Sequence, residues 1–470
     1  MAVAVVGASG YVGRLLVGRL TQLGHRVVAI ARSVEQGPVA AGVDRRAVDV
    51  ADTAAVAQAL VGVSAAYYLV HALAGGPDFA ERDRAAARSF ATAARDAGVR
   101  RVVYLGGLGG GGADDHGAGG DPGALSRHLS SRHEVGDLLR GSGIPVVELQ
   151  AAVVLGAGSI SFEMLRYLTE RLPAMVCPRW VDTRLQPIAE RDLLEYLVRA
   201  PDVPGGIYEI GTPDVTTYQE MMQRYAAIRG LPPRRIVKVP LLTPSLSAHW
   251  VDAVTPVDRR ISHALIESLA TEVVVRRPGA AAVFGIEPMP VADAIKAALD
   301  EQGADLEQRL FDIDEGLADG VFVVRTVATI TPGDAEAVRQ DLFDIGGDLS
   351  WYGVPGAWRL RLAAGRLFGE HLALHRPPQL SAGATVDWWT VAHVDAGSVV
   401  LSTKTWTFGD AWLGYRVTAG TGSARPDALL QVAAFRPRGA LGLAYWRLLW
   451  PVHRVVFVLM ARRRVRGRKR

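Results

Sequence analysis

A glycine-rich turn close to the N-terminus constrains the fold of this chain more than any other feature. The apolar residues 3–6 predict a buried strand, and Gly7, Gly10 and Gly13 follow at the start of an amphipathic stretch that reaches about Leu23. Gly7 allows a tight turn, Gly10 leaves room for a pyrophosphate, and Gly13 allows a helix to pack closely on the strand. Because a helix N-terminus offers unpaired N–H groups to phosphate, the pattern predicts dinucleotide binding.

The composition is that of a globular protein with two or three domains. The chain has 470 residues, of which 49% are hydrophobic and 21% are charged. The net charge of +4 comes from the C-terminus, because seven of the residues 462–470 are Lys or Arg. The excess of positive charge thus lies in this C-terminal tail, and no nucleic-acid partner is expected. The single cysteine, Cys177, excludes an intrachain disulfide and a Cys-rich zinc site. No metal site is predicted.

The sequence predicts a cytoplasmic protein. No signal peptide is expected before the first strand, and one cysteine fits a reducing compartment. A membrane-spanning helix needs about 18–20 apolar residues in a row. The nearest approach, residues 440–461, is interrupted by Arg447, Pro451, His453 and Arg454, so no span is predicted.

Strand and helix patterns alternate through residues 1–158, which predicts a parallel sheet covered on both faces, a doubly wound Rossmann core. After the first strand, strands are expected at residues 25–31, 46–50, 65–70, 101–105 and 145–149. Helices are expected around residues 53–60, 79–97 and 125–140. The glycine-rich residues 106–123 are interpreted as a surface loop, or alternatively as a mobile lid at the ligand-binding edge of the sheet.

Three further regions follow. Residues 159–300 are mainly helical, with short strands expected at 207–210 and 235–239, and are interpreted as a smaller lobe that completes the nucleotide-binding domain. The acidic residues 301–320 are interpreted as a linker. Residues 321–470 contain period-two apolar runs, which predict strands at 321–330, 358–362, 386–393, 399–408 and 429–435. A helix is expected at 334–343, and a closing helix from about Leu441 is followed by the basic tail. This region is predicted to be an α+β domain.

The candidate cofactor site follows the ends of the predicted strands. Arg32 and Ser33 follow the second strand, where an acidic residue would favour NAD and an arginine suits the 2′-phosphate of NADP. NADP(H) is therefore expected over NAD(H), unless Arg32 is only a solvated charge. Asp49 and Val50 would flank the adenine. The full candidate set is Gly7, Ser9, Gly10, Tyr11, Val12, Gly13, Arg32, Ser33, Asp49, Val50, Val70, His71, Gly106 and Arg132.

Four motifs resemble the atypical or extended short-chain dehydrogenases/reductases: GASGYVG at 7–13, DV at 49–50, YYLVH at 67–71 and VVYLGG at 102–107. The NmrA-like proteins and the accessory NADH–ubiquinone oxidoreductase subunit belong to that group. RLQPIAERDLLEYL at 184–197 is similar to its second-lobe signature. The resemblance covers residues 1 to about 300 and implies an NAD(P)-binding Rossmann fold. The whole chain resembles bacterial two-domain proteins in which an uncharacterised domain follows.

The resemblance also implies a catalytic set that this chain lacks. The group's oxidoreductases use a Ser after the fifth strand, then a Tyr and a Lys four residues apart. Here Gly106 and Gly107 end the fifth strand, and alignment of LLRGSG at 138–143 places His128 at the Tyr position and Arg132 at the Lys position. His128 would replace the tyrosine as acid and Arg132 would bind ribose or phosphate. The alternative is that His128 is an ordinary polar residue. Nearby hydroxyls are Ser126, Ser130 and Ser131.

The C-terminal region resembles the START/polyketide-cyclase fold, in which a sheet grips a long helix around an apolar cavity. The tryptophans that would line such a cavity, or else belong to a plain core, are Trp388, Trp406, Trp446 and Trp450. The packed part of the last helix is expected to end by Ala461. The basic residues after it would be a solvated tail, or would attach the protein to anionic lipid at the membrane surface.

Two functions remain open. The first is a redox enzyme that uses NADP(H) on a lipophilic, quinone- or lipid-like substrate, which the intact glycine turn favours. The second is a non-catalytic, NmrA-like dinucleotide sensor that acts through a partner or a membrane surface. The missing Ser, Tyr and Lys favour the sensor. The sequence leaves the substrate and the oligomeric state open.

Overall fold

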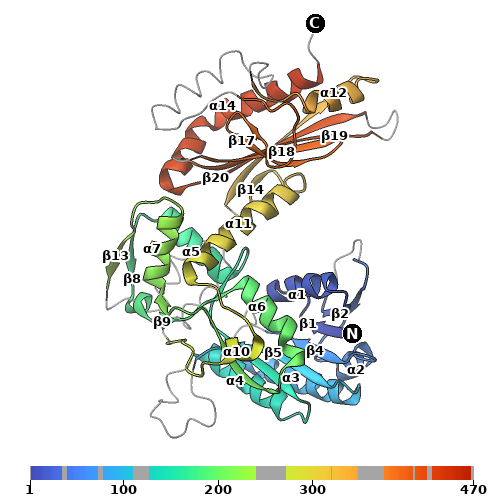
Figure 1. Ribbon diagram of the computed structural model, residues 1–470, viewed down its shortest axis with the longest axis vertical. Helices are drawn as coiled ribbons and strands as arrows, with labels where there is room; N and C mark the ends of the chain where they lie inside the picture. The colour runs from blue at the N-terminus through green and yellow to red at the C-terminus, as the bar shows by residue number, and fades with distance from the viewer. Residues whose placement is uncertain are drawn as a thin grey trace. The chain divides into compact units, whose positions relative to one another are not determined.

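The structure is a computed structural model that describes residues 2–33, 40–71, 78–109, 126–239, 271–318, 320–347, 375–405, 408–420 and 426–466. The chain divides into two compact units, which are described separately below (Figure 1). Unit 1 comprises Met1–Thr169, Ala174–Ile228 and Pro233–Leu299. Unit 2 comprises Glu170–Pro173, Arg229–Pro232 and Asp300–Arg470.

Unit 1 is built on a sheet of seven parallel strands. Their order is β11-β6-β5-β4-β1-β2-β3. The order reverses between β1 and β4, and ligands bind such sheets at the carboxyl ends of the strands beside a reversal. The strands are β1 (Ala2–Val6), β2 (Arg26–Ala31), β3 (Val43–Ala47), β4 (Ala65–Tyr68), β5 (Arg101–Gly107), β6 (Val146–Ala151) and β11 (Gly206–Ile210).

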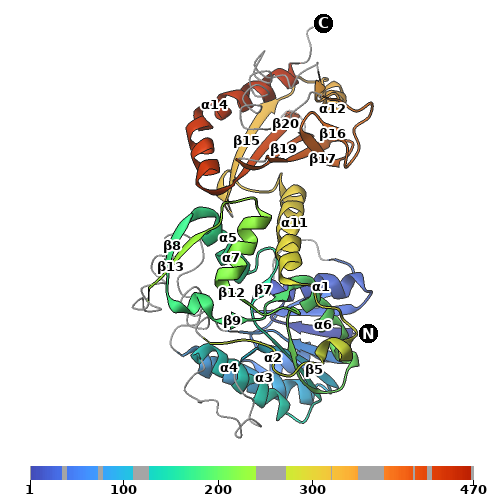
Figure 2. The same cartoon turned by 60° about the vertical axis from the view of Figure 1, so that its left-hand side comes forward.

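Helices cover both faces of this sheet, as Figure 2 shows. On one face, α2 (Thr53–Ala59), α3 (Phe79–Asp96) and α4 (Arg127–Arg140) bury apolar side chains such as Phe90 and Leu139. On the other face, α1 (Tyr11–Gln22) and α6 (Glu190–Arg199) bury Leu16 and Leu193. Burial on both faces explains the short, uncharged strands β1 and β4. The doubly wound α/β fold is therefore confirmed.

The region predicted as a smaller lobe that completes the nucleotide-binding domain contributes a strand to this sheet. β11 pairs in parallel with β6, from Gly206 opposite Val147 to Ile210 opposite Ala151, and α6 packs beside α1. The other helices described after α4 are α5 (Ile160–Arg171), η3 (Arg179–Asp182), η4 (Ala200–Asp202), α7 (Tyr218–Ile228), α10 (Ala280–Phe284) and α11 (Val291–Arg309). The last residues of α5, from Glu170, and of α11, from Asp300, are assigned to unit 2. Its short strand pairs are β7 (Val154–Leu155) with β10 (Ile188–Ala189), β9 (Arg184–Leu185) with β12 (Thr216–Thr217), and β8 (Ala174–Cys177) with β13 (Arg235–Lys238).

Two local predictions for unit 1 need comment. The third strand, expected at residues 46–50, is Val43–Ala47, because this edge strand has the sequence VDRRA and lacks the apolar run that marks buried strands. The proposed lid at residues 106–123 falls largely on residues 110–125, which lie outside the described residues.

Unit 2 contains an antiparallel sheet of seven strands in the order β14-β15-β20-β19-β18-β17-β16. The strands are β14 (Gly316–Ala318), β15 (Val321–Thr329), β16 (Thr385–Val386), β17 (Trp389–Val394), β18 (Ser398–Thr405), β19 (Gly409–Thr418) and β20 (Ala428–Pro437). The helices in the described part of unit 2 after α11 are α12 (Ala335–Leu342) and α14 (Gly439–Val465), the latter long enough to cross much of the sheet. The strand expected at 358–362 lies outside the described residues.

The acidic stretch 301–320 is not a linker in the structure. It contains the end of α11 and strand β14, because Leu306, Leu310 and Phe311 are apolar and are buried against one face of the second sheet. On the opposite face, α12 and α14 bury Leu342, Trp446 and Met460.

Three of the four tryptophans considered for a cavity, Trp388, Trp446 and Trp450, pack in or against the core of unit 2. Trp446 stacks on Phe435 and Phe322, with ring centroids 4.9 and 5.6 Å apart. Trp388 and Trp450 pack against the same cluster, and Trp406 lies outside the described residues. The expected end of the packed helix at Ala461 is wrong, because Arg464 is fully buried and its Nη1 donates to the carbonyl of Asp341 at 3.0 Å.

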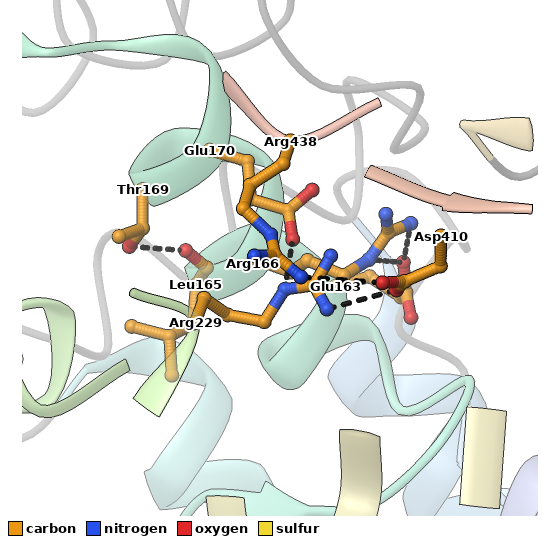
Figure 3. A network of polar contacts seen from close by, with 8 residues as sticks. All are labelled: Glu163, Leu165, Arg166, Thr169, Glu170, Arg229, Asp410 and Arg438. Atoms are coloured by element: carbon orange, nitrogen blue, oxygen red, sulfur yellow. Dashed lines mark hydrogen bonds and ion pairs between the residues drawn. The ribbon is translucent and has the colours of Figure 1, made fainter. Parts of the chain in front are cut away.

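A cluster of buried charges lies within unit 2 (Figure 3). Nη1 of Arg229 donates to Asp410 at 2.9 Å, and its Nε donates to Glu170 at 3.3 Å. Nη2 of Arg438 donates to the other carboxylate oxygen of Asp410, also at 3.3 Å. Burial alone would raise the pKa of Asp410, but the guanidinium groups of Arg229, Arg436 and Arg438 outweigh it and hold that pKa below its usual range.

Candidate dinucleotide site

The turn after β1 requires glycine at two positions. Gly7 has φ +93°, and a Cβ there would lie 2.9 Å from the backbone carbonyl carbon of Leu69. A Cβ on Gly13 would lie 2.2 Å from the carbonyl oxygen of Gly7. Both distances are shorter than real Cβ contacts. The first glycine therefore makes the turn, and the third lets α1 start directly against it.

The start of α1 is open to an anion. Gly10 is the N-cap residue of α1, and no side chain caps the helix. Ser9 and Gly10 are exposed, while Val12 is half-buried. The unpaired N–H groups of a first helical turn, together with the helix dipole, attract phosphate. This exposed, uncapped first turn, which glycine at positions 7 and 13 makes possible, fits the pyrophosphate of a dinucleotide.

Tyr11 joins the glycine turn to α6. Its hydroxyl donates to the carboxylate of Glu190, the first residue of α6. A Cβ on Gly156 would lie 2.2 Å from that carboxylate and 2.4 Å from the Tyr11 hydroxyl, so glycine is required there as well. The side chain of Tyr11, expected among the cofactor contacts, thus has a partner within the protein.

The residues expected around the adenosine end lie at the same sheet edge. The N–H groups of Gly7 and Ala8 donate to the carbonyl of Ile30 at 2.9 and 3.0 Å, which places the end of β2 beside the turn. Arg32 and Ser33 follow directly and are exposed. After β3, Asp49 is also exposed and accepts from the N–H of Ala51 at 3.0 Å. Val50 and Val70 instead pack against the hydrophobic core.

Two histidines and a carboxylate form a chain of polar contacts at the carboxyl end of β4. Nδ1 of His71 lies 3.2 Å from a carboxylate oxygen of Asp83, and its Nε2 lies 3.2 Å from Nδ1 of His128. Ser131 donates to the same oxygen of Asp83 at 3.3 Å. Asp83 is 3% exposed. The chain therefore begins at a buried carboxylate on α3 and ends at His128 on α4, whose Nε2 has no hydrogen-bond partner among the described residues.

The surroundings keep both imidazoles neutral. Burial, then the charge of Arg132 and the neighbouring His71, lower the pKa of His128 to about 2. Burial also lowers the pKa of His71, although its hydrogen bond to Asp83 opposes this. When the carboxylate of Asp83 accepts from Nδ1 of His71, each neutral histidine carries its proton on Nδ1, and Nε2 of His128 accepts hydrogen bonds. If this pair of histidines takes up one additional proton, Nε2 of His128 becomes a hydrogen-bond donor.

Arg132 lies one helical turn after His128, and its guanidinium is held at the end of β5. Its Nη2 donates to the carbonyl of Leu105 at 2.6 Å, and its own carbonyl accepts from the Tyr104 hydroxyl at 2.8 Å. A Cβ on Gly107 would lie 3.3 Å from its Cδ. Nε of Arg132 is buried without a hydrogen-bond partner among the described residues. A bound phosphate or ribose oxygen would satisfy such a donor.

The structure thus assembles most of the predicted set at one sheet edge and adds one residue that the sequence reasoning missed. Asp83 was not singled out, although a carboxylate on the helix after His71 was visible in the sequence. Ser131, considered only as a nearby hydroxyl, donates to Asp83. Ser126 instead caps α4 by accepting from the N–H of Leu129 at 3.2 Å. Gly106 is buried, beside Glu148. Among the described residues no group of three or more side chains could hold a metal ion.

Comparisons with known proteins agree with this fold. Residues 7–160 match a family described as NAD(P)H-binding, and residues 321–460 match a family described as a protein of unknown function (DUF2867). No curated protein matches the chain. The second match carries no activity, so the expected START-like fold of the C-terminal region stays a prediction.

Solved structures similar to the chain are reductases and nucleotide-sugar enzymes. The triphenylmethane reductase of Citrobacter sp. is 20% identical, with a TM-score of 0.50 over 64% of this chain and 100% of its own. The NADPH-dependent quinone oxidoreductase QOR2 of Escherichia coli, solved with NADPH, is 17% identical, with a TM-score of 0.50 over 63% of this chain and 99% of its own. WbmG of Bordetella bronchiseptica, solved with NAD and UDP, is 18% identical, with a TM-score of 0.50 over 63% and 93%. At these identities the likeness shows the fold alone: unit 1 shares the doubly wound α/β fold of these structures.

Proposed function

We propose that the protein is an NADP(H)-dependent oxidoreductase that reduces a lipophilic, quinone-like carbonyl compound, with His128 as the proton-transfer group. The observation that carries this proposal is the chain from Asp83 through His71 to His128. It lies at the carboxyl edge of the sheet, beside the glycine turn, because Gly7 contacts Leu69 two residues before His71. Buried, hydrogen-bonded histidine–carboxylate chains are typical of proton-transfer sites.

The bound nicotinamide would supply a hydride to the carbonyl carbon, and the carbonyl oxygen must then receive a proton. In the protonated chain, Nε2 of His128 donates that proton. The Nδ1 proton of His128 stays in the 3.2 Å contact with Nε2 of His71, which accepts it, so both imidazoles are neutral after the transfer. The Nδ1 proton of His71 stays hydrogen-bonded to Asp83 throughout, so the carboxylate fixes the tautomer of this relay, which consists of Asp83, His71 and His128. Atoms and charges balance: the substrate gains a hydride and a proton, and the relay loses one proton.

Arg132 takes the place of the usual lysine but performs a different task. Its guanidinium stays charged, so it cannot transfer a proton. Its charge lowers the pKa of His128. A weakly basic His128 in turn makes the protonated relay a strong acid. The unpaired Nε of Arg132 supports a second role, as donor to a ribose or phosphate oxygen of the cofactor.

Two observations support the choice of cofactor and substrate. Arg32 is exposed at the end of β2, where its charge can pair with the 2′-phosphate of NADP. The similar fold of an NADPH-dependent quinone oxidoreductase shows that such a scaffold accommodates quinone reduction. Oxidation of NADPH in the presence of a panel of quinones and aromatic aldehydes tests the proposal. Turnover with at least one of them is expected, with NADPH preferred over NADH.

The second candidate function is that of a dinucleotide sensor without turnover. It is favoured by the low pKa of His128, because the relay is unprotonated at neutral pH, and by the absence of a serine at the end of β5. A sensor would bind NADPH as tightly as the enzyme does, yet would oxidise it with none of the carbonyl compounds. The same panel therefore separates the two functions.

A further inference from the structure

The long helix α14 has one face in the core of unit 2. Trp446, Met460 and Arg464 are buried on this face, against β15, β20 and α12. Phe457 packs on the same cluster, and its carbonyl accepts from the side chain of Gln431 at 3.1 Å. The orientation of α14 about its own axis is therefore fixed by packing within unit 2.

The opposite face of α14 exposes large apolar side chains to solvent. Leu441 is 70% exposed, Leu448 79%, Val452 56% and Val455 59%. Their spacing of seven, four and three residues places them on one stripe of the helix. Single exposed apolar residues are common on protein surfaces, but a continuous row of them marks an interaction site.

Basic side chains border this stripe. Arg447 and Arg454 are exposed, seven residues apart, and lie along one side of it. At the C-terminal end, Arg462, Arg463 and Arg466 are exposed, and Arg468, Lys469 and Arg470 follow in the sequence. No Asp or Glu occurs from Gly439 to the end of the chain. An apolar stripe with only positive charge around it is complementary to anionic headgroups over hydrocarbon.

By length and composition, α14 is also the one helix among the described residues that could cross a membrane, over Leu441–Val465. A span is disfavoured, because it would place Arg447 and Arg454 in hydrocarbon and remove Trp446 and Met460 from the core of unit 2. Lying in the interface satisfies both faces at once. The apolar stripe enters the headgroup region while the arginine side chains reach the phosphates.

We propose that α14 binds unit 2 to the surface of an anionic lipid bilayer. In this arrangement the bilayer takes up the apolar side chains of Leu441, Leu448, Val452 and Val455, and the flanking arginines contact the headgroups. This inference does not depend on the proposed redox activity. Each basic residue near an anionic surface strengthens binding by about fivefold. The electrostatic part weakens as the Debye length falls from about 10 Å at 0.1 M salt to about 3 Å at 1 M.

The test is co-sedimentation of the full chain with vesicles of phosphatidylcholine alone, or with about 30% phosphatidylglycerol. The wild type should bind the anionic vesicles at low salt and leave them at high salt. The double variant Leu448→Glu, Val455→Glu should bind at least about tenfold more weakly, since it replaces two inserted side chains by carboxylates. A truncation after Arg466 removes three basic residues, keeps the buried Arg464, and should weaken binding to the anionic vesicles only.

The matched control is Val61→Glu, Val327→Glu. These valines are 69% and 68% exposed, outside α14, so their replacement should leave vesicle binding unchanged. Near-ultraviolet circular dichroism establishes that each variant is folded. The proposal is overturned if the wild type stays in the supernatant with anionic vesicles at low salt. It is equally overturned if both double variants bind as the wild type does, or if the bound protein resists high salt and alkaline washing as a spanning protein would.

Discussion

Nε2 of His71 lies 3.2 Å from Nδ1 of His128, and the opposite nitrogen of His71 lies 3.2 Å from the carboxylate of Asp83. The two rings come from different segments, one after β4 and the other on α4, and their centroids are 4.6 Å apart. A histidine chain that begins at a buried carboxylate gives His128 a fixed tautomer. In the proposed reaction it would provide, at the carboxyl edge of the sheet, the proton that the Ser, Tyr and Lys of short-chain dehydrogenases/reductases supply.

The glycine turn gives the first prediction. Gly13→Ala places a Cβ 2.2 Å from the carbonyl oxygen of Gly7, so the turn must shift and NADPH affinity should fall at least about tenfold. The measurement is titration calorimetry. Gly18→Ala on the same helix is the control, because a Cβ there meets nothing within 4 Å. It should keep full affinity and raise stability by about 0.5–1 kcal/mol. Equal NADPH affinity in both variants would contradict the claim that the glycine turn binds the pyrophosphate of NADPH.

The second prediction concerns the choice of cofactor. Arg32→Ala removes a charge-assisted contact to the 2′-phosphate worth about 1.5–3 kcal/mol, so the Kd for NADPH should rise roughly tenfold to hundredfold while that for NADH stays the same. Arg26→Ala, at the other end of β2, is the control and should change neither Kd. If the wild type binds NADH as tightly as NADPH, the preference for NADP(H) is wrong.

The third prediction is the pH dependence of carbonyl reduction. The pKa of His128 is lowered to about 2, so at neutral pH only a small fraction of the relay carries the extra proton. That fraction rises as pH falls, and kcat/KM for reduction should increase about tenfold per pH unit between about pH 8 and about pH 6. Arg132→Gln removes a charge that lowers this pKa and should move the profile to higher pH. A flat profile for both proteins would contradict the relay.

The fourth prediction concerns the charge cluster of unit 2. The pKa of Asp410 is held below its usual range, so its contribution to stability is present above about pH 4 and is lost as the pH falls through the lowered value. Asp410→Asn removes the buried carboxylate that Arg229 and Arg438 share, leaves Glu170 as the carboxylate paired with Arg229, and should cost about 3–5 kcal/mol at neutral pH.

Chemical denaturation across this pH range measures the effect. Asp305→Asn is the control, because its pair with Arg309 is exposed and worth at most about 1 kcal/mol. If Asp410→Asn is no less stable than Asp305→Asn at neutral pH, the cluster does not stabilise unit 2.

Much of unit 1 could be predicted because its signals are local. Gly7 and Gly13 mark the turn by themselves, and short apolar runs mark β1, β4 and β5. The position of β11 could not be predicted from such signals. Pairing with β6 depends on contacts about sixty residues apart, which periodicity does not encode. The end of α11 was mistaken for a linker because its acidic residues conceal the buried Leu306 and Leu310.

The candidate site likewise combines residues that local motifs predict with residues that only long-range contacts bring together. Alignment of a motif placed His128 and Arg132 on α4, and the structure puts both at the cofactor edge. The partnership of His71 with His128 joins residues 57 apart, and Asp83 comes from a third segment. No spacing rule connects these three residues, so only the fold reveals them. The strand Gly409–Thr418 of unit 2 was not predicted from the sequence, because the glycines of this segment interrupt the period-two pattern.

The most direct test of the redox proposal compares His128→Gln with His133→Gln. Both histidines lie on α4, but His133 contacts the carbonyl of Gly107 at 3.1 Å and takes no part in the relay. The measurement is the single-turnover rate of NADPH oxidation by the best quinone or aldehyde acceptor, together with the Kd for NADPH. We expect His128→Gln to lose at least about a hundredfold in rate with an unchanged Kd, and His133→Gln to keep most of the wild-type rate. Equal rates in the two variants, or no NADPH oxidation by the wild type with any acceptor, would contradict the account.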